Sequence, residues 1–238
     1  MDKTMTVDIF SSKILGIKDL TKDVKKILLS VPSGFEFKPG QYLSLSVINN
    51  KGQRIRKPFS IANKPKGVND FIEFCVKIIP GGLASEFIKK LKIGEDVELF
   101  GPAGRFVINS YEKDLIFIAS GVGIAPFMSM IPDLLHNGFQ KRIILLKSAR
   151  TEEDSLYDKE LDALTKMHSN FEFYNIFSNP KDKELDWGYL QDFLEEYVPE
   201  DFKGNFFLCG LEQMIIDVKA QLSAMNFKEE QIFTEKFD

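Results

Sequence analysis

Residues 115–132 run for 18 residues without a charged side chain, which is long enough for a helix that spans a membrane. Two glycines, Gly121 and Gly123, and two prolines, Pro126 and Pro132, interrupt this stretch. Such residues break a single long helix, whereas they suit a buried strand that ends in a tight turn and leads into a helix. The stretch therefore predicts a strand–turn–helix unit and argues against a membrane span.

The rest of the second half repeats this alternation of apolar runs and helical patterns. We expect strands at 115–119, 143–146, 171–177, 206–209 and 232–234, and helices at 125–136, 156–167, 188–197 and 213–225. Strands that alternate with helices favour a parallel sheet covered on both faces. The second half is therefore predicted to be a doubly wound α/β domain.

The first hundred residues have a different pattern. Leu43, Leu45 and Val47 alternate with serines, which is the period of a half-buried strand. Further strands are expected at 24–31, 56–62 and 71–79, with a short helix at 85–91. Short strands at this spacing predict an antiparallel Greek-key β-barrel. We thus expect a barrel domain at residues 1–108 and an α/β domain at 109–238, with 109–113 as the linker.

Composition excludes several classes of function. Lysine and arginine number 31 against 35 acidic residues, for a net charge of −4, so there is no basic field to attract nucleic acid. Two cysteines cannot supply the four thiolates of an iron–sulfur cluster. His136 and His168 are too few and too far apart in sequence to indicate a metal site. The charged first ten residues resemble no secretion signal, so we expect reduced thiols in the cytoplasm.

One glycine motif, Gly121-Val122-Gly123-Ile124-Ala125-Pro126, lies where the first strand of the second half meets its helix. Glycine allows a pyrophosphate to approach the backbone, and the free N–H groups of a helix start bind anions. Proline is tolerated in the first helical turn. The third glycine of the common dinucleotide motif is absent, and residues 147–150 offer no carboxylate for a ribose. By itself the motif suits a phosphate site and a structural turn about equally.

A second motif, Gly81-Gly82-Leu83-Ala84-Ser85, lies between a strand and the short helix of the barrel half. A phosphate could accept hydrogen bonds from its backbone and from the Ser85 hydroxyl. A β-turn with Ser85 as the helix N-cap would explain the same residues.

The third motif is Lys57-Pro58-Phe59-Ser60. On a strand, Lys57 and Phe59 face one side and Ser60 the other. The cation could meet a phosphate and the ring could line a flat ligand. A surface lysine beside a core phenylalanine is the alternative interpretation.

Together with Cys209-Gly210 at the end of an apolar strand, these motifs resemble those of the ferredoxin–NADP reductase family, and the likeness extends from residue 37 to residue 237. The resemblance implies a flavin-binding barrel followed by an NAD(P)-binding domain. It implies hydride transfer from NADH or NADPH to a bound flavin, FAD in preference to FMN. Electrons would then pass to a separate acceptor: ferredoxin, flavodoxin, a heme protein or an oxygenase component.

The resemblance also implies roles for individual residues. Ser60, Cys209 and Glu235 would border the reacting rings as catalytic residues. Lys57 stands where the family has arginine, and Phe59 where it has tyrosine, so a point charge replaces a bidentate fork and one hydroxyl is lost. The implied cofactor-binding residues are Lys57, Pro58, Phe59, Ser60, Val76, Gly81, Gly82, Leu83, Ala84, Ser85, Gly121, Val122, Gly123, Ile124, Ala125, Pro126, Arg150, Ser178, Cys209, Gly210 and Phe237.

Several alternatives remain open on the sequence alone. The substitutions at Lys57 and Phe59 suit a free-flavin reductase, whereas the intact 81–85 motif favours a retained flavin. An electron-transfer subunit of a larger complex is a second alternative, and a noncatalytic nucleotide-binding regulator is a third. Ser178 is followed by Asn179, where NADPH-dependent members often carry arginine, and this slightly favours NADH.

Overall fold

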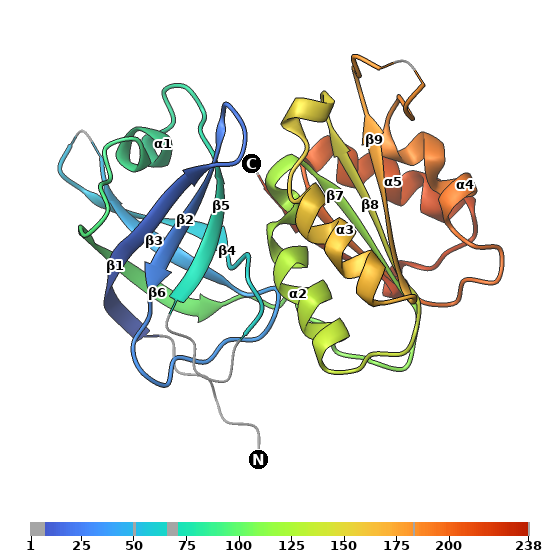
Figure 1. Cartoon of the computed structure of the whole chain (residues 1–238), viewed down its shortest axis with the longest axis horizontal. Helices are drawn as coiled ribbons and strands as arrows, with labels where there is room; N and C mark the ends of the chain where they lie inside the picture. The colour runs from blue at the N-terminus through green and yellow to red at the C-terminus, as the bar shows by residue number, and fades with distance from the viewer. Residues whose placement is uncertain (1–7, 50, 66–70, 183, 238) are drawn as a thin grey trace. The chain divides into compact units, whose positions relative to one another are not determined.

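The computed structural model describes residues 8–49, 51–65, 71–182 and 184–237. The chain forms two compact units (Figure 1). One comprises residues 1–107 and 128–133, and the other comprises 108–127 and 134–238.

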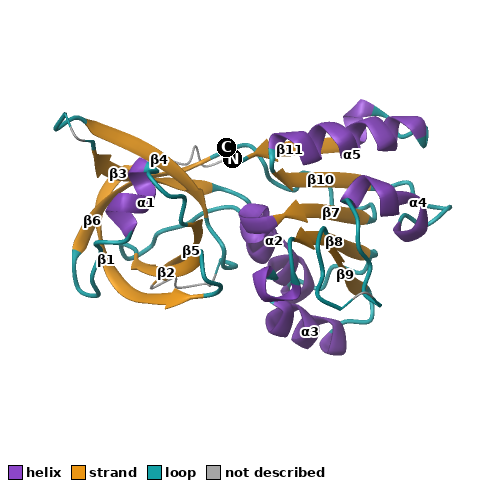
Figure 2. Cartoon of the chain, turned by 90° about the horizontal axis from the view of Figure 1, so that it is seen from above, coloured by secondary structure: helices purple, strands orange, loops and turns teal. Residues whose placement is uncertain are grey.

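The first unit is a six-stranded sheet in the order β4-β3-β6-β1-β2-β5, and all neighbouring strands are antiparallel. An isolated bridge between Ile61 and Phe74 links the two end strands, and the sheet curls into a barrel (Figure 2). The predicted antiparallel barrel is therefore confirmed. Its elements are β1 (Asp8–Asp19), β2 (Val24–Ser30), β3 (Tyr42–Ile48), β4 (Arg54–Ser60), β5 (Phe71–Lys77), α1 (Leu83–Ile88) and β6 (Asp96–Ala103).

Alternating apolar residues fill this barrel. Leu43, Leu45 and Val47 on β3 are at most 2% exposed, and Ile72 and Phe74 of β5 lie in the same core cluster. Because successive strand residues face opposite sides, every second residue of these strands points inward.

Sequence analysis did not anticipate β1 and β6. Only Ser12 and Ile14 of β1 are buried, and its pairing with β2 is irregular between Ile14 and Gly16. The alternating pattern is therefore weak, and long-range pairing on both sides defines this strand. The predicted helix at 85–91 was also misplaced, since α1 covers Leu83–Ile88.

The second unit contains a five-stranded parallel sheet in the order β11-β10-β7-β8-β9. Figure 1 shows α2 and α3 on one face and α4 and α5 on the other, which confirms the doubly wound prediction. The strands are β7 (Leu115–Ser120), β8 (Ile143–Ala149), β9 (Phe171–Phe177), β10 (Asn205–Gly210) and β11 (Ile232–Lys236). The helices that alternate with these strands along the chain are α2 (Ala125–His136), whose residues 128–133 belong to the first unit, α3 (Asp158–Met167), α4 (Leu194–Tyr197) and α5 (Glu212–Ala224). Short 3₁₀ segments are η1 (Gly121–Ile124), η2 (Glu152–Asp154), η3 (Leu190–Phe193) and η4 (Glu229–Gln231).

The uncharged stretch 115–132 forms β7, η1 and part of α2, as predicted. Within the described part of the chain, no helix has the length and apolar character needed to cross a membrane. The single helix expected at 188–197 was wrong: Tyr189 has extended backbone at φ −114° and ψ 150°, and the 3₁₀ segment η3 precedes the short α4. Likewise α3 starts at Asp158 and not at residue 156, because Tyr157 adopts a left-handed φ of 64°.

Candidate functional site

The β4 motif presents a cation and an aromatic ring on one face. Lys57 and Phe59 are the register partners of Leu45 and Leu43, so they share a face of the sheet, as the alternation predicted. Lys57 is exposed, whereas Phe59 is half-buried with its ring centre 5.4 Å from that of Phe74. Pro58 is exposed and Ser60 is only 4% exposed.

The Gly81-Gly82 motif forms a tight turn between β5 and α1. Gly81 has a φ of +73°, which glycine adopts without strain, and the Gly82 N–H donates to Ile79 O at 3.0 Å. The Ser85 hydroxyl accepts a hydrogen bond from the Ile79 N–H at 2.8 Å. Ser85 lies inside α1, and Gly82 precedes the helix. The alternative role of Ser85 as an N-cap was therefore wrong, and its hydroxyl closes the turn.

Three other residues assigned to flavin binding turn their side chains inward. Val76 is 3% exposed and belongs to the barrel core, and Leu83 and Ala84 pack against that core. Val76 can therefore offer a ligand only its backbone, whereas Leu83 and Ala84 remain half-buried.

The Gly121 motif lies at the carboxyl end of β7, where η1 leads into α2. Gly121 has a φ of +53°, and no atom lies within 4 Å of the position that a Cβ would take. At Gly123 a Cβ would lie 2.2 Å from the Cys209 carbonyl oxygen. Gly121 is thus needed for its positive φ, and Gly123 is needed because it packs closely on the backbone of β10. The side chains of Ile124, Ala125 and Pro126 are buried, and Val122 is half-buried.

Cys209 and Glu235 lie opposite each other on parallel strands β10 and β11. Cys209 is fully buried. Burial raises the pKa of its thiol well above the usual value, and the Glu235 carboxylate adds to the effect. The thiol is therefore neutral at physiological pH. Beside this pair, the half-buried Phe237 donates its N–H to Gly210 O at 2.9 Å.

Sequence analysis missed the serine that supports this end of the sheet. Gly210 has a φ of +147°, and a Cβ there would lie 2.1 Å from Ser120 Oγ. The same hydroxyl accepts a hydrogen bond from the Leu211 N–H at 3.0 Å. Ser120 thus joins the end of β7 to the turn after β10. The available signal was a serine directly between an apolar strand and a glycine turn.

Arg150 and Ser178, assigned to the nucleotide, are exposed at the ends of β8 and β9. Their two loops are joined, because the Asn179 N–H donates to Arg150 O at 2.8 Å. Sequence analysis did not single out Glu152, whose carboxylate accepts the backbone N–H groups of residues 181 and 182 at 2.8–3.1 Å. These hydrogen bonds lower the pKa of Glu152 and stabilise both loops.

An ion pair between a buried lysine and a partly exposed aspartate stabilises the same region. Lys147 is 5% exposed, its Nζ lies 2.6 Å from Asp158 Oδ1, and it donates to Ser155 Oγ at 2.6 Å. Burial lowers the pKa of Lys147, and the Asp158 carboxylate opposes this effect. Because an unpaired charge there would be costly, the pair fixes the path of the chain between β8 and α3.

Comparisons with known proteins cover both units. An oxidoreductase FAD-binding domain family matches residues 11–108, and an oxidoreductase NAD-binding domain family matches residues 117–220. The reductase component of phenol 2-monooxygenase from Pseudomonas sp. strain CF600 is 34% identical over an alignment of 239 positions, which covers 97% of this chain and 66% of that protein. The chain spans about two thirds of the length of such curated relatives.

Solved structures show the same fold. The Amycolatopsis cytochrome P450 reductase superposes with a TM-score of 0.87 at 24% identity, over 98% of this chain and 71% of that one. A ferredoxin NADP⁺ reductase from Neisseria gonorrhoeae, solved with FAD and NADP bound, gives a TM-score of 0.83 at 23% identity, over 96% and 98% of the two chains.

Proposed function

Because this chain belongs to the ferredoxin–NADP reductase-like family of FAD- and NAD(P)-binding reductases, we propose that it oxidises NADH or NADPH and passes the electrons through FAD to a separate acceptor protein. One observation carries the proposal: an FAD-binding family and an NAD-binding family match consecutive parts of a single chain. An enzyme that holds both cofactors can bring a nicotinamide and a flavin within reacting distance.

The barrel residues fit a flavin nucleotide in their chemistry. Lys57 offers an exposed cation for a phosphate, Phe59 offers a half-buried aromatic ring, and Ser60 offers a hydroxyl at the end of the same strand. When bound, FAD supplies a ring that accepts a hydride and later gives up the electrons. In this proposal Lys57 neutralises phosphate charge, and Ser60 holds a hydrogen bond near the reacting ring.

The second unit fits a pyridine dinucleotide. The Gly121 turn leaves open space in front of a backbone at the carboxyl end of β7, which is where open α/β sheets bind nucleotides. In this proposal Cys209 and Glu235 border the nicotinamide. A neutral, buried thiol would act there by shaping the site and excluding water, because a nucleophile would require the thiolate.

The curated relatives indicate the class of electron acceptor. Two of them are reductase or electron-transfer components of phenol 2-monooxygenase and anthranilate 1,2-dioxygenase. We therefore place the acceptor among oxygenase components and small electron-carrier proteins. Neither cysteine forms a disulfide, which suits a cytoplasmic location.

The test uses the purified protein incubated with FAD and then freed of unbound flavin. We expect a yellow protein whose absorbance bleaches on anaerobic addition of NADH or NADPH, and which then reduces ferricyanide or cytochrome c catalytically. A protein that retains no FAD or FMN, or that fails to bleach with either coenzyme, would overturn the proposal. If turnover requires added free flavin, the protein is a free-flavin reductase.

A further inference from the structure

The edge strand β9 uses only one side of its backbone for the sheet. The backbone N–H and C=O groups of its even-numbered residues, and of the even-numbered residues that flank it, point toward β8. The Ser178 N–H donates to Ala149 O at 3.1 Å, and Asn170 O accepts from the Ile143 N–H at 2.8 Å. Backbone groups alternate in direction along a strand. The odd-numbered residues of β9 therefore direct their N–H and C=O groups toward the open edge.

One odd-numbered residue already has a partner there. The Phe177 N–H donates to Asp186 O at 2.9 Å, and the Gly188 N–H donates to Phe177 O at 2.9 Å. This short pairing around Trp187 is parallel and extends the sheet by one residue. Among the described residues, no segment continues it past Phe173 and Asn175. These two residues therefore present two donors and two acceptors to an incoming strand.

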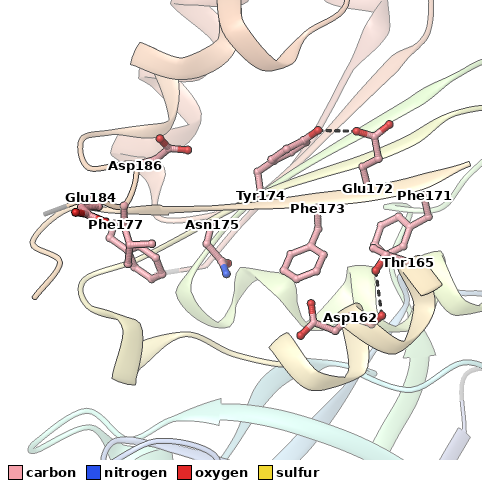
Figure 3. A pocket seen from close by; sticks show the side chains of 11 residues that line it. Asp162, Thr165, Phe171, Glu172, Phe173, Tyr174, Asn175, Phe177, Glu184 and Asp186 are labelled. Atoms are coloured by element: carbon pink, nitrogen blue, oxygen red, sulfur yellow. Dashed lines mark hydrogen bonds between the residues drawn. The ribbon is translucent and has the colours of Figure 1, made fainter. Parts of the chain in front are cut away.

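The open edge lies in a groove of about 600 Å³. Figure 3 shows Phe173 and Asn175 on the side of β9 that faces α3, and Tyr174 and Glu172 on the opposite side. Asp162 of α3 also lines the groove. A strand placed beside β9 would thus find an aromatic side chain and a carboxylate on each of its two faces.

The groove is acidic, and no lysine or arginine lines it within the described part of the chain. Its four carboxylates form no ion pair with a described lysine or arginine. Two of these carboxylates accept hydrogen bonds from neutral tyrosines: Glu172 from Tyr174 and Asp186 from Tyr197. The Tyr174–Glu172 hydrogen bond, 2.5 Å long, raises the pKa of Tyr174 to about 12. The Asp162 carboxylate also opposes the lowering of the Lys147 pKa by burial, so its charge is partly offset within the protein. The charges of Glu172, Glu184 and Asp186 are left for a partner. The carboxylates belong to Asp162, Glu172, Glu184 and Asp186.

The geometry points to an interaction surface for a partner protein: an extended segment rich in lysine or arginine pairs with Phe173 and Asn175 as a sixth strand of the sheet. Backbone pairing would supply affinity, and the carboxylates would select basic side chains. A second copy of this chain is a poor occupant, because pairing β9 with β9 would bring two sets of four carboxylates together.

The surface lies at the edge of the sheet opposite the proposed nicotinamide end of the redox site, and its carboxyl end adjoins Ser178, which is assigned to the nucleotide. β9 and β11 are the two opposite edges of the sheet, and Glu235 lies on β11. A segment bound at β9 therefore leaves the Cys209–Glu235 pair uncovered. We expect binding at β9 to leave the rate of coenzyme oxidation with ferricyanide unchanged when the coenzyme is saturating.

A synthetic peptide, acetyl-Lys-Val-Arg-Val-Lys-Val-amide, serves as the probe for the intact FAD-loaded protein. Trp187 is the single tryptophan, is 62% exposed and lies where the groove meets the existing pairing, so its fluorescence reports binding. Calorimetry gives the dissociation constant. A peptide N-methylated at its four central residues keeps the charge but blocks backbone pairing, and a glutamate-substituted peptide reverses the charge. We expect both controls to bind at least about tenfold more weakly, since each loses a hydrogen-bonding or electrostatic contribution of about 1.4 kcal/mol.

Matched variants test the protein side. Asn175→Pro removes the open N–H without removing a bond to β8, whereas Asn175→Ala removes the side chain and its 3.3 Å hydrogen bond to Asp158 but keeps that N–H. We expect Asn175→Pro to weaken peptide binding about tenfold relative to Asn175→Ala. Glu172→Gln/Glu184→Gln should weaken binding and reduce its salt dependence. Glu36→Gln/Glu230→Gln removes the same charge from exposed positions elsewhere and should not weaken binding.

Several outcomes would overturn the proposal. Equal binding of the plain and N-methylated peptides would show nonspecific charge attraction and no strand pairing; this comparison remains decisive if Asn175→Pro does not fold. No binding up to about 1 mM would mean that the carboxylates only guard the edge against self-association. A dimer in sedimentation velocity that Glu172→Gln/Glu184→Gln strengthens would make a second copy the occupant.

Discussion

Cys209 on β10 is the register partner of Glu235 on β11, so a buried thiol and a half-buried carboxylate occupy the ends of adjacent parallel strands. Gly123 packs closely on the Cys209 carbonyl and so also fixes the backbone of β10 at this residue. The two groups are therefore fixed relative to each other by the sheet. An ionised thiol beside that carboxylate would be unfavourable, which makes the pair sensitive to alkaline pH.

The first prediction is a loss of stability at alkaline pH that depends on Cys209. In the unfolded chain the thiol ionises near about pH 8.5, whereas burial and Glu235 raise its pKa in the folded state. The native state then holds the proton more tightly, so this contribution is complete below about pH 8.5 and is lost as the pH rises. Urea unfolding should give a free energy that falls by up to about 1.4 kcal/mol per pH unit above that point, and Cys209→Ala should remove this slope. Equal slopes in the two proteins would contradict the prediction.

The second prediction separates the two glycines of the Gly121 motif. Gly123→Ala places a methyl group 2.2 Å from a backbone oxygen and should cost about 2–3 kcal/mol of unfolding free energy. Gly121→Ala meets no neighbour but strains a φ of +53°, and should cost about 1 kcal/mol. Gly138→Ala, with a φ of +77° and open space, is the matched control for the smaller effect. Denaturant titrations measure all three, and an equal loss at both motif positions would refute the packing role of Gly123.

The third prediction concerns flavin affinity. Lys57→Arg should tighten FAD binding, because a planar guanidinium can donate two parallel hydrogen bonds to a phosphate. Lys57→Ala should weaken it, and the dissociation constant follows from fluorescence of the released flavin. If neither variant changes that constant, Lys57 does not contact the phosphate.

The fourth prediction assigns Ser60 to hydride transfer. Ser60→Ala should retain its flavin but bleach about 10- to 100-fold more slowly with NADH or NADPH in single-turnover mixing, which corresponds to about 1.4–2.8 kcal/mol of barrier. A solely structural serine would instead lower flavin content or stability, and the loaded fraction would react at the normal rate. Flavin content and rate are therefore measured on the same sample.

The fold was predictable where the pattern was local. The apolar runs at β7, β8 and β10, each followed by helical periodicity, define a parallel sheet without any long-range information. β1 was not predictable, because only two of its residues are buried and its identity depends on pairing with β2 and β6. The division of residues 190–197 into η3 and α4 was missed for a similar reason, since residue periodicity does not distinguish a 3₁₀ turn from an α-helical turn.

The residues of the candidate site were likewise predictable only where the sequence signal was local. The glycine turns could be located from spacing, and the register of Cys209 with Glu235 agrees with their common assignment, while their catalytic roles remain predictions. Ser120 had one local signal, its place between an apolar strand and a glycine turn, but its partner, the Leu211 N–H, is remote in sequence. Lys147 and Glu152 could not be identified, because their partners lie on other segments of the fold. Their importance comes from burial and from backbone hydrogen bonds, neither of which is visible in residue type alone.

The contact between Gly123 and Cys209 has a consequence for how this protein can diverge. Gly123 approaches the carbonyl oxygen of residue 209 and not its side chain, so the turn depends on the backbone path and is indifferent to which small residue stands there. Mutational drift at position 209 can therefore alter the chemistry beside Glu235 without moving the turn. Position 123 has no such freedom, and a lineage that keeps this sheet must keep its glycine.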